Sequence, residues 1–378
     1  MILSSHGVMN HKIFYGASLA ALILGGCQTT KVGPKALRSF QGAYNEVITM
    51  NTDEQLLQNI VRLRYRDNPV FVEVNDITQS NGVDNSGDST LDKTFVGADA
   101  GKYVGKGIGK LGLASKNSST IKFSQLKGKD FVNKLMTPIQ RPIVLSMMES
   151  GWRPERVFNL CVERVNNLYN AQTAGGPTPR FAPDYKPFYQ WTDLLTRLYR
   201  SHVIDLGEKP DTNFSDLYLV IHPKPGYERE ISKFKELAGL KSSESWFKFK
   251  DNFADMSSTK LVLRCRTLLA MLFFLSQGVD VPEKEKLAGL VTTTKNPDGS
   301  NFNWSDISNR LLNVRFSESS KKMRPEGAYV SCRYRGKWFY ISDNDAESKA
   351  TFLMISQIFA LQSAASYKPT SPTLVLAR

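Results

Sequence analysis

The first strong hydrophobic pattern in the chain predicts an amphipathic helix that begins near residue 52. Apolar side chains recur at the three- and four-residue spacing of one helix face, at Leu56, Leu57, Ile60, Val61 and Leu63. Thr52 and Gln55 have the spacing of a capping box. Asn68-Pro69 ends the pattern, because the residue before a proline avoids helical geometry.

Shorter patterns predict that strands and helices follow one another through the rest of the chain. We expect strands at residues 70–74, 120–126, 203–206, 217–221 and 246–249, and helices at 130–136, 144–148, 188–198 and 227–240. Residues 157–168 fit either a strand or a helix. The most apolar stretch, residues 261–275, predicts a buried central helix that Gly278 caps. This stretch is too short to cross a bilayer, which needs about 20 residues.

The clearest local signals lie near the C-terminal end. Residues 329–334 and 337–341 flank Arg335-Gly336, which predicts a β-hairpin. Residues 343–345 offer an N-cap for a following helix with an apolar stripe, at Phe352, Ile355 and Phe359. These patterns together predict an α+β fold of antiparallel strands and packed helices, in one or two subdomains.

The proline and glycine content suggests where the chain divides. Residues 171–187 hold two glycines and four prolines, which is typical of a linker or a long surface loop. We therefore expect an N-terminal α+β subdomain over residues 51–170 and a C-terminal one over residues 188–378. Residues 27–50 are expected to form a tether.

The first 27 residues predict where the protein goes. One basic residue, Lys12, precedes an apolar run that ends in Leu24-Gly25-Gly26-Cys27. This layout resembles the lipobox of bacterial lipoproteins. The resemblance implies that residues 1–26 are a signal peptide, that cleavage falls between Gly26 and Cys27, and that Cys27 carries the lipid. An ordinary secretory signal with a chance cysteine is the alternative. Gln28, rather than aspartate, follows the cysteine and by the same resemblance favours the outer membrane.

Three phrases of the mature chain also resemble a family of uncharacterised bacterial lipoproteins. They are QNIVRLRY at residues 58–65, LSQGVDVP at residues 275–282, and YRGKWFYI at residues 334–341 followed by residues 348–361. None of these phrases is a catalytic signature. The resemblance therefore supports lipid attachment and implies no activity.

The charge of the chain favours anionic partners. The formal charge is +13, and Lys12 is the single charged residue of the signal. Residues 102–134 hold eight lysines and one acid. A basic segment of this kind can bind an anionic membrane surface or can be a mobile loop. The candidate surface-binding residues are Lys102, Lys106, Lys110, Lys116, Lys122, Lys127 and Lys129. Three arginines crowd the end of the first helix and are expected to be solvated or to pair with Asp67 or Glu73: Arg62, Arg64 and Arg66.

The remaining chemistry-bearing residues do not form a recognised catalytic or metal-binding motif. Cys161, Cys265 and Cys332 lack metal-ligand spacing and are expected to be buried, with at most one disulfide among them. Glycine motif 107–112 lacks the flanking strand and helix of a nucleotide site. The trio Ser201, His202 and Asp205 is too close in sequence to suggest a triad. Three carboxylates, Asp343, Asp345 and Glu347, could serve a hydrolase but suit helix capping equally well.

These observations lead to one leading expectation and one alternative. We expect a non-enzymatic outer-membrane lipoprotein, facing the periplasm, that acts as a scaffold or assembly factor for an envelope complex. Its partners would be membrane lipid, through Cys27, and an envelope protein, with no cofactor, metal or nucleic acid. The alternative is an envelope-binding module that contacts anionic lipid or lipid A through the lysine-rich segment.

Overall fold

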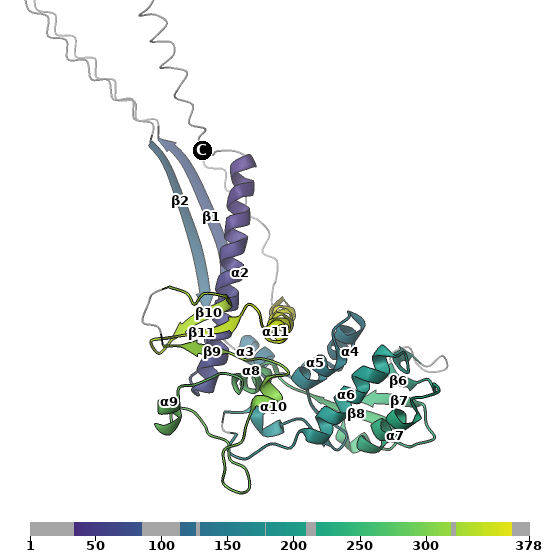
Figure 1. Ribbon diagram of the computed structural model, residues 1–378. Helices are drawn as coiled ribbons and strands as arrows, with labels where there is room; N and C mark the ends of the chain where they lie inside the picture. Colours follow the sequence, from purple (N-terminus) through teal and green to yellow (C-terminus); the bar gives the residue numbers. More distant parts are fainter. Residues whose placement is uncertain are drawn as a thin grey trace, which may run out of the picture. The chain divides into compact units, whose positions relative to one another are not determined.

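The structure is a computed structural model that describes residues 34–84, 114–125, 129–177, 179–208, 217–318 and 323–364. The chain separates into two compact units. The first comprises residues 1–49 and 74–124, and the second comprises residues 50–73 and 125–378. The architecture combines helices with mixed sheets (Figure 1), which confirms the predicted α+β class.

The described part of the first unit consists of a helical segment and a two-stranded sheet. Strand β1 (Val72–Asp84) pairs with strand β2 (Ala114–Gln125). Helix α2 (Pro34–Arg64) begins in this unit and ends in the second. Residues 34–50 are therefore helical, and the tether expected over residues 27–50 stays a prediction. Thr52 lies inside the helix rather than at its start. Proline is favoured at the first helical position, and no later proline precedes Pro69.

The largest sheet of the second unit has six strands in the order β4-β3-β8-β7-β6-β5. Their bounds are β3 (Val162–Val165), β4 (Leu168–Tyr169), β5 (Ile204–Glu208), β6 (Leu217–Ile221), β7 (Trp246–Lys250) and β8 (Lys260–Cys265). Neighbouring strands are antiparallel except β7 and β8, which are parallel. The predicted strands at 203–206, 217–221 and 246–249 are confirmed.

This sheet also corrects the expected division of the chain. Strand β3 precedes residues 171–187, yet it pairs with β8, which follows them. Both strands belong to the second compact unit. Residues 171–187 therefore form a connection within one unit, which includes the short helix η1 (Gln172–Gly175). A high content of proline and glycine indicates a loop, but it does not show which strands pair across that loop.

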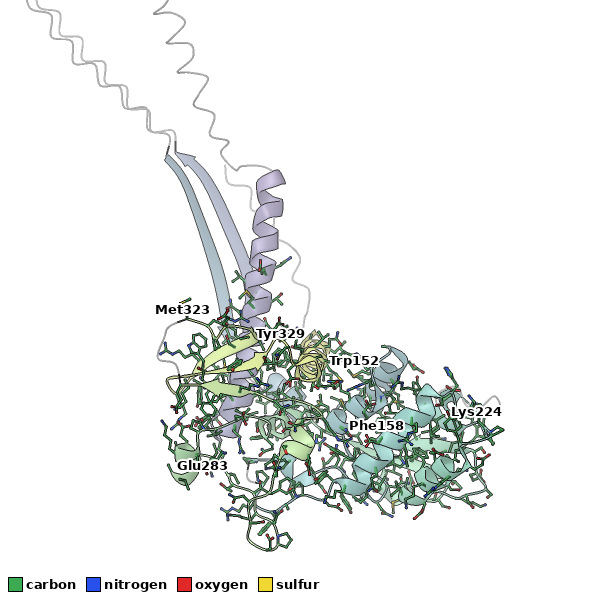
Figure 2. The ribbon with its side chains drawn as sticks, in the orientation of Figure 1. Trp152, Phe158, Lys224, Glu283, Met323 and Tyr329 are labelled. Atoms are coloured by element: carbon green, nitrogen blue, oxygen red, sulfur yellow. The ribbon has the colours of Figure 1, made fainter. Side chains whose placement is uncertain are left out.

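Helices pack on the strands around an aromatic core. Their bounds are α3 (Lys129–Met136), α4 (Arg141–Glu149), α5 (Pro154–Cys161), α6 (Lys186–Arg200), α7 (Glu228–Leu237) and α8 (Leu268–Ser276), with a short η2 (Phe253–Asp255). The ring of Trp191 on α6 stacks on Phe234 of α7 at 5.0 Å and lies 5.6 Å from Phe158 of α5. All three side chains are fully buried, and Figure 2 shows Phe158 inside this body.

The apolar stretch at residues 261–275 is not one helix. Strand β8 occupies its first part and helix α8 its second, and Thr267 caps the helix by accepting the N–H of Ala270. Residues 157–168 divide in the same way, into the end of α5, strand β3 and the start of β4. Buried residues follow one another without a gap at 160–162 and at 261–263, so that periodicity could not separate strand from helix there.

Gly278 follows α8, but it serves close packing rather than a left-handed cap. A Cβ atom at this position would lie 1.9 Å from the backbone oxygen of Leu312. The helix cap is Gln277 instead. The absence of a side chain at residue 278 lets the chain return directly against residues 312–314, where the N–H of Val314 donates to the Gly278 carbonyl.

The C-terminal elements confirm the predicted hairpin and helix. Strand β10 (Ala328–Tyr334) pairs antiparallel with β11 (Lys337–Ser342), which also pairs with β9 (Arg315–Ser317). Arg335 and Gly336 both have positive φ, 46° and 79°, as a two-residue type I′ turn requires. Helix α11 (Ala346–Ala364) follows, and Asp345 accepts the N–H of Ser348 in its first turn.

Candidate functional site

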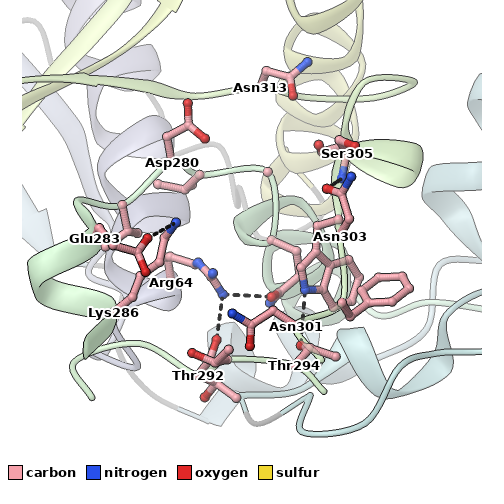
Figure 3. Close-up of a pocket in the computed structure, with 18 of the residues that line it drawn as sticks. Arg64, Asp280, Glu283, Lys286, Thr292, Thr294, Asn301, Asn303, Ser305 and Asn313 are labelled. Carbon is pink, nitrogen blue, oxygen red and sulfur yellow. Dashed lines mark hydrogen bonds and ion pairs between the residues drawn. The ribbon is translucent and has the colours of Figure 1, made fainter. Parts of the chain in front are cut away.

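A polar cavity of the described chain lies wholly within the second unit. Its volume is about 640 Å³. It is formed by the end of α2, the segment after α8, the short helix α9 (Glu283–Leu287), residues 292–305 and strand β9. The helix α10 (Ser305–Ser308) closes one side. We call this cavity the Arg64 pocket, after the arginine in the middle of the view in Figure 3.

Arg64 is a half-buried cation held in a fixed orientation. Its Nη1 donates to Gln277 Oε1 at 3.0 Å and to the Thr292 carbonyl at 3.4 Å. Its Nε is buried and has no hydrogen-bond partner. Burial lowers the pKa of Arg64 to about 10, while Tyr65 and Asp280 act in the opposite direction. The guanidinium is therefore charged at neutral pH.

The expectation that the three arginines at the end of α2 are solvated is wrong for Arg64. Arg66 is exposed, but Arg64 lines the pocket. The spacing of the sequence could have predicted this burial, because residue 64 lies seven positions after Leu57 and three after Val61, both fully buried. These intervals place Arg64 on the apolar face of the helix.

Charged side chains of both signs surround Arg64. Lys286 and Glu283 pair with each other at 3.2 Å. Lys295 donates to the side-chain oxygen of Asn301 at 2.6 Å. Burial raises the pKa of Asp280, and nearby Lys286, Arg315 and Arg64 oppose that rise. The lining as a whole holds four cations and two carboxylates: Arg64, Lys286, Lys295 and Arg315, against Asp280 and Glu283.

The neutral part of the wall is rich in amides and hydroxyls. It includes Gln277, Thr292, Thr293, Thr294, Asn301, Asn303, Ser305, Ser308, Asn309 and Asn313. The indole Nε1 of Trp304 donates to Thr294 Oγ1 at 3.2 Å, and the Trp304 ring lies edge-on to Phe302 at 5.0 Å. These groups offer a ligand many hydrogen-bond donors and acceptors together with an aromatic surface.

A buried polar cluster fixes helix α9, which forms one wall of the pocket. Glu285 accepts hydrogen bonds from Tyr65 at 2.6 Å and from Lys337 at 2.5 Å. Burial by itself would raise the pKa of Glu285, but the hydrogen bonds from Lys337 and Tyr65 outweigh it and hold the pKa below its ordinary value. This cluster ties α9 to the end of α2 and to strand β11, so the pocket wall is anchored at both sides.

Most of the residues that the sequence singled out lie outside the described part. Gly26, Cys27 and four of the candidate lysines fall there: Lys102, Lys106, Lys110 and Lys127. Lys116 and Lys122 lie on β2, and Lys129 begins α3, but their side chains are also outside the described set. Lipidation and binding to an anionic surface therefore stay predictions.

The three candidate carboxylates near the C-terminus all have structural partners. Asp343 pairs with Lys349 at 2.6 Å, and Asp345 caps α11. Glu347 binds the guanidinium of the buried Arg156. These contacts account for the carboxylates through helix capping and ion pairing.

The serine, histidine and aspartate trio and the three cysteines also have structural rather than catalytic contacts. Ser201 accepts a hydrogen bond from the Tyr227 hydroxyl at 3.0 Å, and Asp205 pairs with His222 at 3.4 Å rather than with His202. Cys161, Cys265 and Cys332 are buried, as predicted, and none of the three forms a disulfide.

Among the described residues, no cluster of histidine, cysteine or carboxylate side chains could hold a metal ion. No described helix has the length and apolar character needed to cross a membrane. Comparison with protein-family models, curated proteins and solved structures also found no match to this chain.

Proposed function

We propose that this protein is a lipid-anchored, non-enzymatic scaffold that holds an envelope partner at the periplasmic face of the outer membrane. The observation that carries the proposal is the lipobox at residues 24–27, with Gln28 after the cysteine. Three acyl chains on Cys27 would supply a firm anchor, because each buried methylene contributes about 0.8 kcal/mol. The mature chain is long enough to present a large folded surface next to that anchor.

The contacts of the three carboxylates that could serve a hydrolase support a binding role for this protein. Asp343, Asp345 and Glu347 are engaged in capping and ion pairs. The Arg64 pocket offers a fixed guanidinium together with amides, hydroxyls and charged side chains of both signs. Such a lining suits recognition of a polar ligand.

Crosslinking in living cells tests this proposal. The lipidated protein would be crosslinked, purified and analysed by mass spectrometry for what accompanies it. We expect one dominant envelope protein at comparable yield. The matched control is Cys27→Ser, which leaves the folded body unchanged but removes the lipid attachment point, and should lose most of the partner. Absence of any enriched protein from the wild-type sample would contradict a scaffold role.

The same samples examine the alternative role of the lysine-rich segment. Enrichment of lipopolysaccharide or anionic phospholipid without a protein would favour direct envelope binding. Replacing Lys102, Lys106 and Lys110 with glutamine should then cut salt-sensitive liposome binding sharply, since each lysine near an anionic surface contributes about 1 kcal/mol.

A further inference from the structure

We propose that the Arg64 pocket binds an acidic sugar, meaning a hydroxyl-rich ring that carries a carboxylate. This site does not depend on lipid attachment or on a protein partner. Its volume of about 640 Å³ falls in the range of small-molecule sites, about 300–1,000 Å³. All of its lining belongs to one compact unit, so the cavity is built by a single packed body.

The charge balance of the lining favours an anion. Glu283 and Lys286 neutralise each other through their ion pair at 3.2 Å. Of the remaining charged groups, Arg64, Lys295 and Arg315 outnumber the one carboxylate, Asp280. Neither Arg64 nor Arg315 has an ion-pair partner in the described part of the chain. A carboxylate on the ligand would supply that missing negative charge.

The geometry of Arg64 suits recognition of a planar anion. Gln277 and the Thr292 carbonyl hold Nη1 in place, while the buried Nε has no hydrogen-bond partner. Figure 3 shows Thr292 beside Arg64. A guanidinium that is held at Nη1 loses little entropy when its remaining donors bind a ligand. Arginine also presents its donors as a flat fork that matches a carboxylate.

The neutral wall suits the rest of a sugar. Asn313 offers an amide donor and an acceptor, which a ring hydroxyl can use in both directions. Asn303 adds an amide donor, while its Oδ1 accepts the N–H of Ser305 at 3.0 Å. Trp304 adds an amphipathic aromatic surface whose N–H is already satisfied by Thr294. An apolar ligand would leave these polar groups unpaired, which costs free energy at every group. A cationic ligand would oppose the excess of positive charge.

Calorimetric titration of the purified mature protein tests the proposal with defined probes. N-acetylmuramic acid represents cell-wall sugars, and ketodeoxyoctonic acid represents those of lipopolysaccharide. N-acetylglucosamine is the neutral comparison. We expect at least one acid to bind, and to bind more tightly than the neutral sugar. Whichever acid binds more tightly identifies the source of the ligand.

Variants separate the pocket from general charge effects. Arg315→Gln changes an exposed side chain of the lining, and Arg64→Gln removes the fixed guanidinium. Each should weaken binding of the acid about tenfold, equivalent to about 1.4 kcal/mol, with little change for the neutral sugar. The control is Arg197→Gln on α6, an exposed arginine outside the pocket, which should bind like wild type.

Three results would overturn the proposal. They are no binding of either acid at millimolar concentration, equal binding of acidic and neutral sugars, and an undiminished affinity in Arg315→Gln. The last variant keeps the test decisive even if Arg64→Gln fails to fold, because Arg315 is exposed.

Discussion

Arg266 is the buried cation whose removal should damage the fold most. It follows strand β8, and its side chain is 1% exposed. Its guanidinium stacks over the Phe274 ring at 4.0 Å and donates to backbone carbonyls rather than to a carboxylate. The acceptors are the carbonyls of Asn159, Leu160, Val162 and Asn170. Burial lowers the pKa of Arg266 to about 10, so the side chain is charged at neutral pH.

The cost of Arg266→Met follows from these acceptors. The carbonyls of Asn159 and Val162 also accept the side-chain amide of Asn170 and keep that partner. The carbonyls of Leu160 and Asn170 lose the guanidinium that satisfies them. Each unsatisfied buried group costs about 1–3 kcal/mol, so we expect a loss of about 4 kcal/mol. That is a large fraction of a typical stability of about 5–15 kcal/mol.

Urea unfolding of the mature chain, followed by tryptophan fluorescence, measures this loss. With a slope of about 2–3 kcal/mol per molar urea, the midpoint should fall by about 1.5 M. Arg264→Met is the matched control, because Arg264 lies two residues earlier on β8, is exposed, and makes a cation–π contact with the Phe253 ring. The control should stay within about 1 kcal/mol of wild type. A similarly small effect of Arg266→Met would refute the reasoning.

Three further predictions follow from other buried groups. Gly278→Ala should destabilise the protein by about 2–4 kcal/mol and disturb the Arg64 pocket, because the new Cβ would overlap the Leu312 carbonyl. Thermal unfolding measures this loss of stability. An unchanged midpoint temperature would argue against the close approach of residues 278 and 312. Glu285→Gln should lower stability at neutral pH. Because hydrogen bonding depresses the pKa of Glu285 below 4.5 in the fold, that contribution is present above pH 4.5 and is lost as pH falls through the folded pKa. The difference between wild type and variant should therefore shrink in acid, and a difference independent of pH would contradict this. The three buried thiols should not react with a thiol reagent until the protein unfolds, since burial raises their pKa; rapid reaction of the native protein would contradict their burial.

Local signals predicted those parts of the fold whose geometry is set by a few neighbouring residues. The turn at Arg335-Gly336 needs two positive φ angles, and a residue pair that contains glycine between two strand patterns predicts such a turn. Asp345 at the start of α11 is predictable for the same reason, since an N-cap acts over three residues.

Features that depend on distant partners were not predictable from these signals. Arg266 lies between β8 and α8, and its guanidinium binds carbonyls about 100 residues earlier in the chain. Periodicity could have placed Arg64 on the buried face, but nothing local shows that residues 277–305 complete a pocket around it. The pairing of β3 with β8 across residues 171–187 is non-local in the same way.

The claim on which the proposed function most depends is lipid attachment at Cys27. Mass spectrometry of the protein purified from bacterial membranes tests it directly, by the mass of the N-terminal peptide after proteolysis. We predict that the mature chain begins at Cys27 and carries the mass of three acyl chains and a glyceryl group, and that Cys27→Ser abolishes this species. An unmodified mature N-terminus, at Cys27 or at any other residue, would contradict the account.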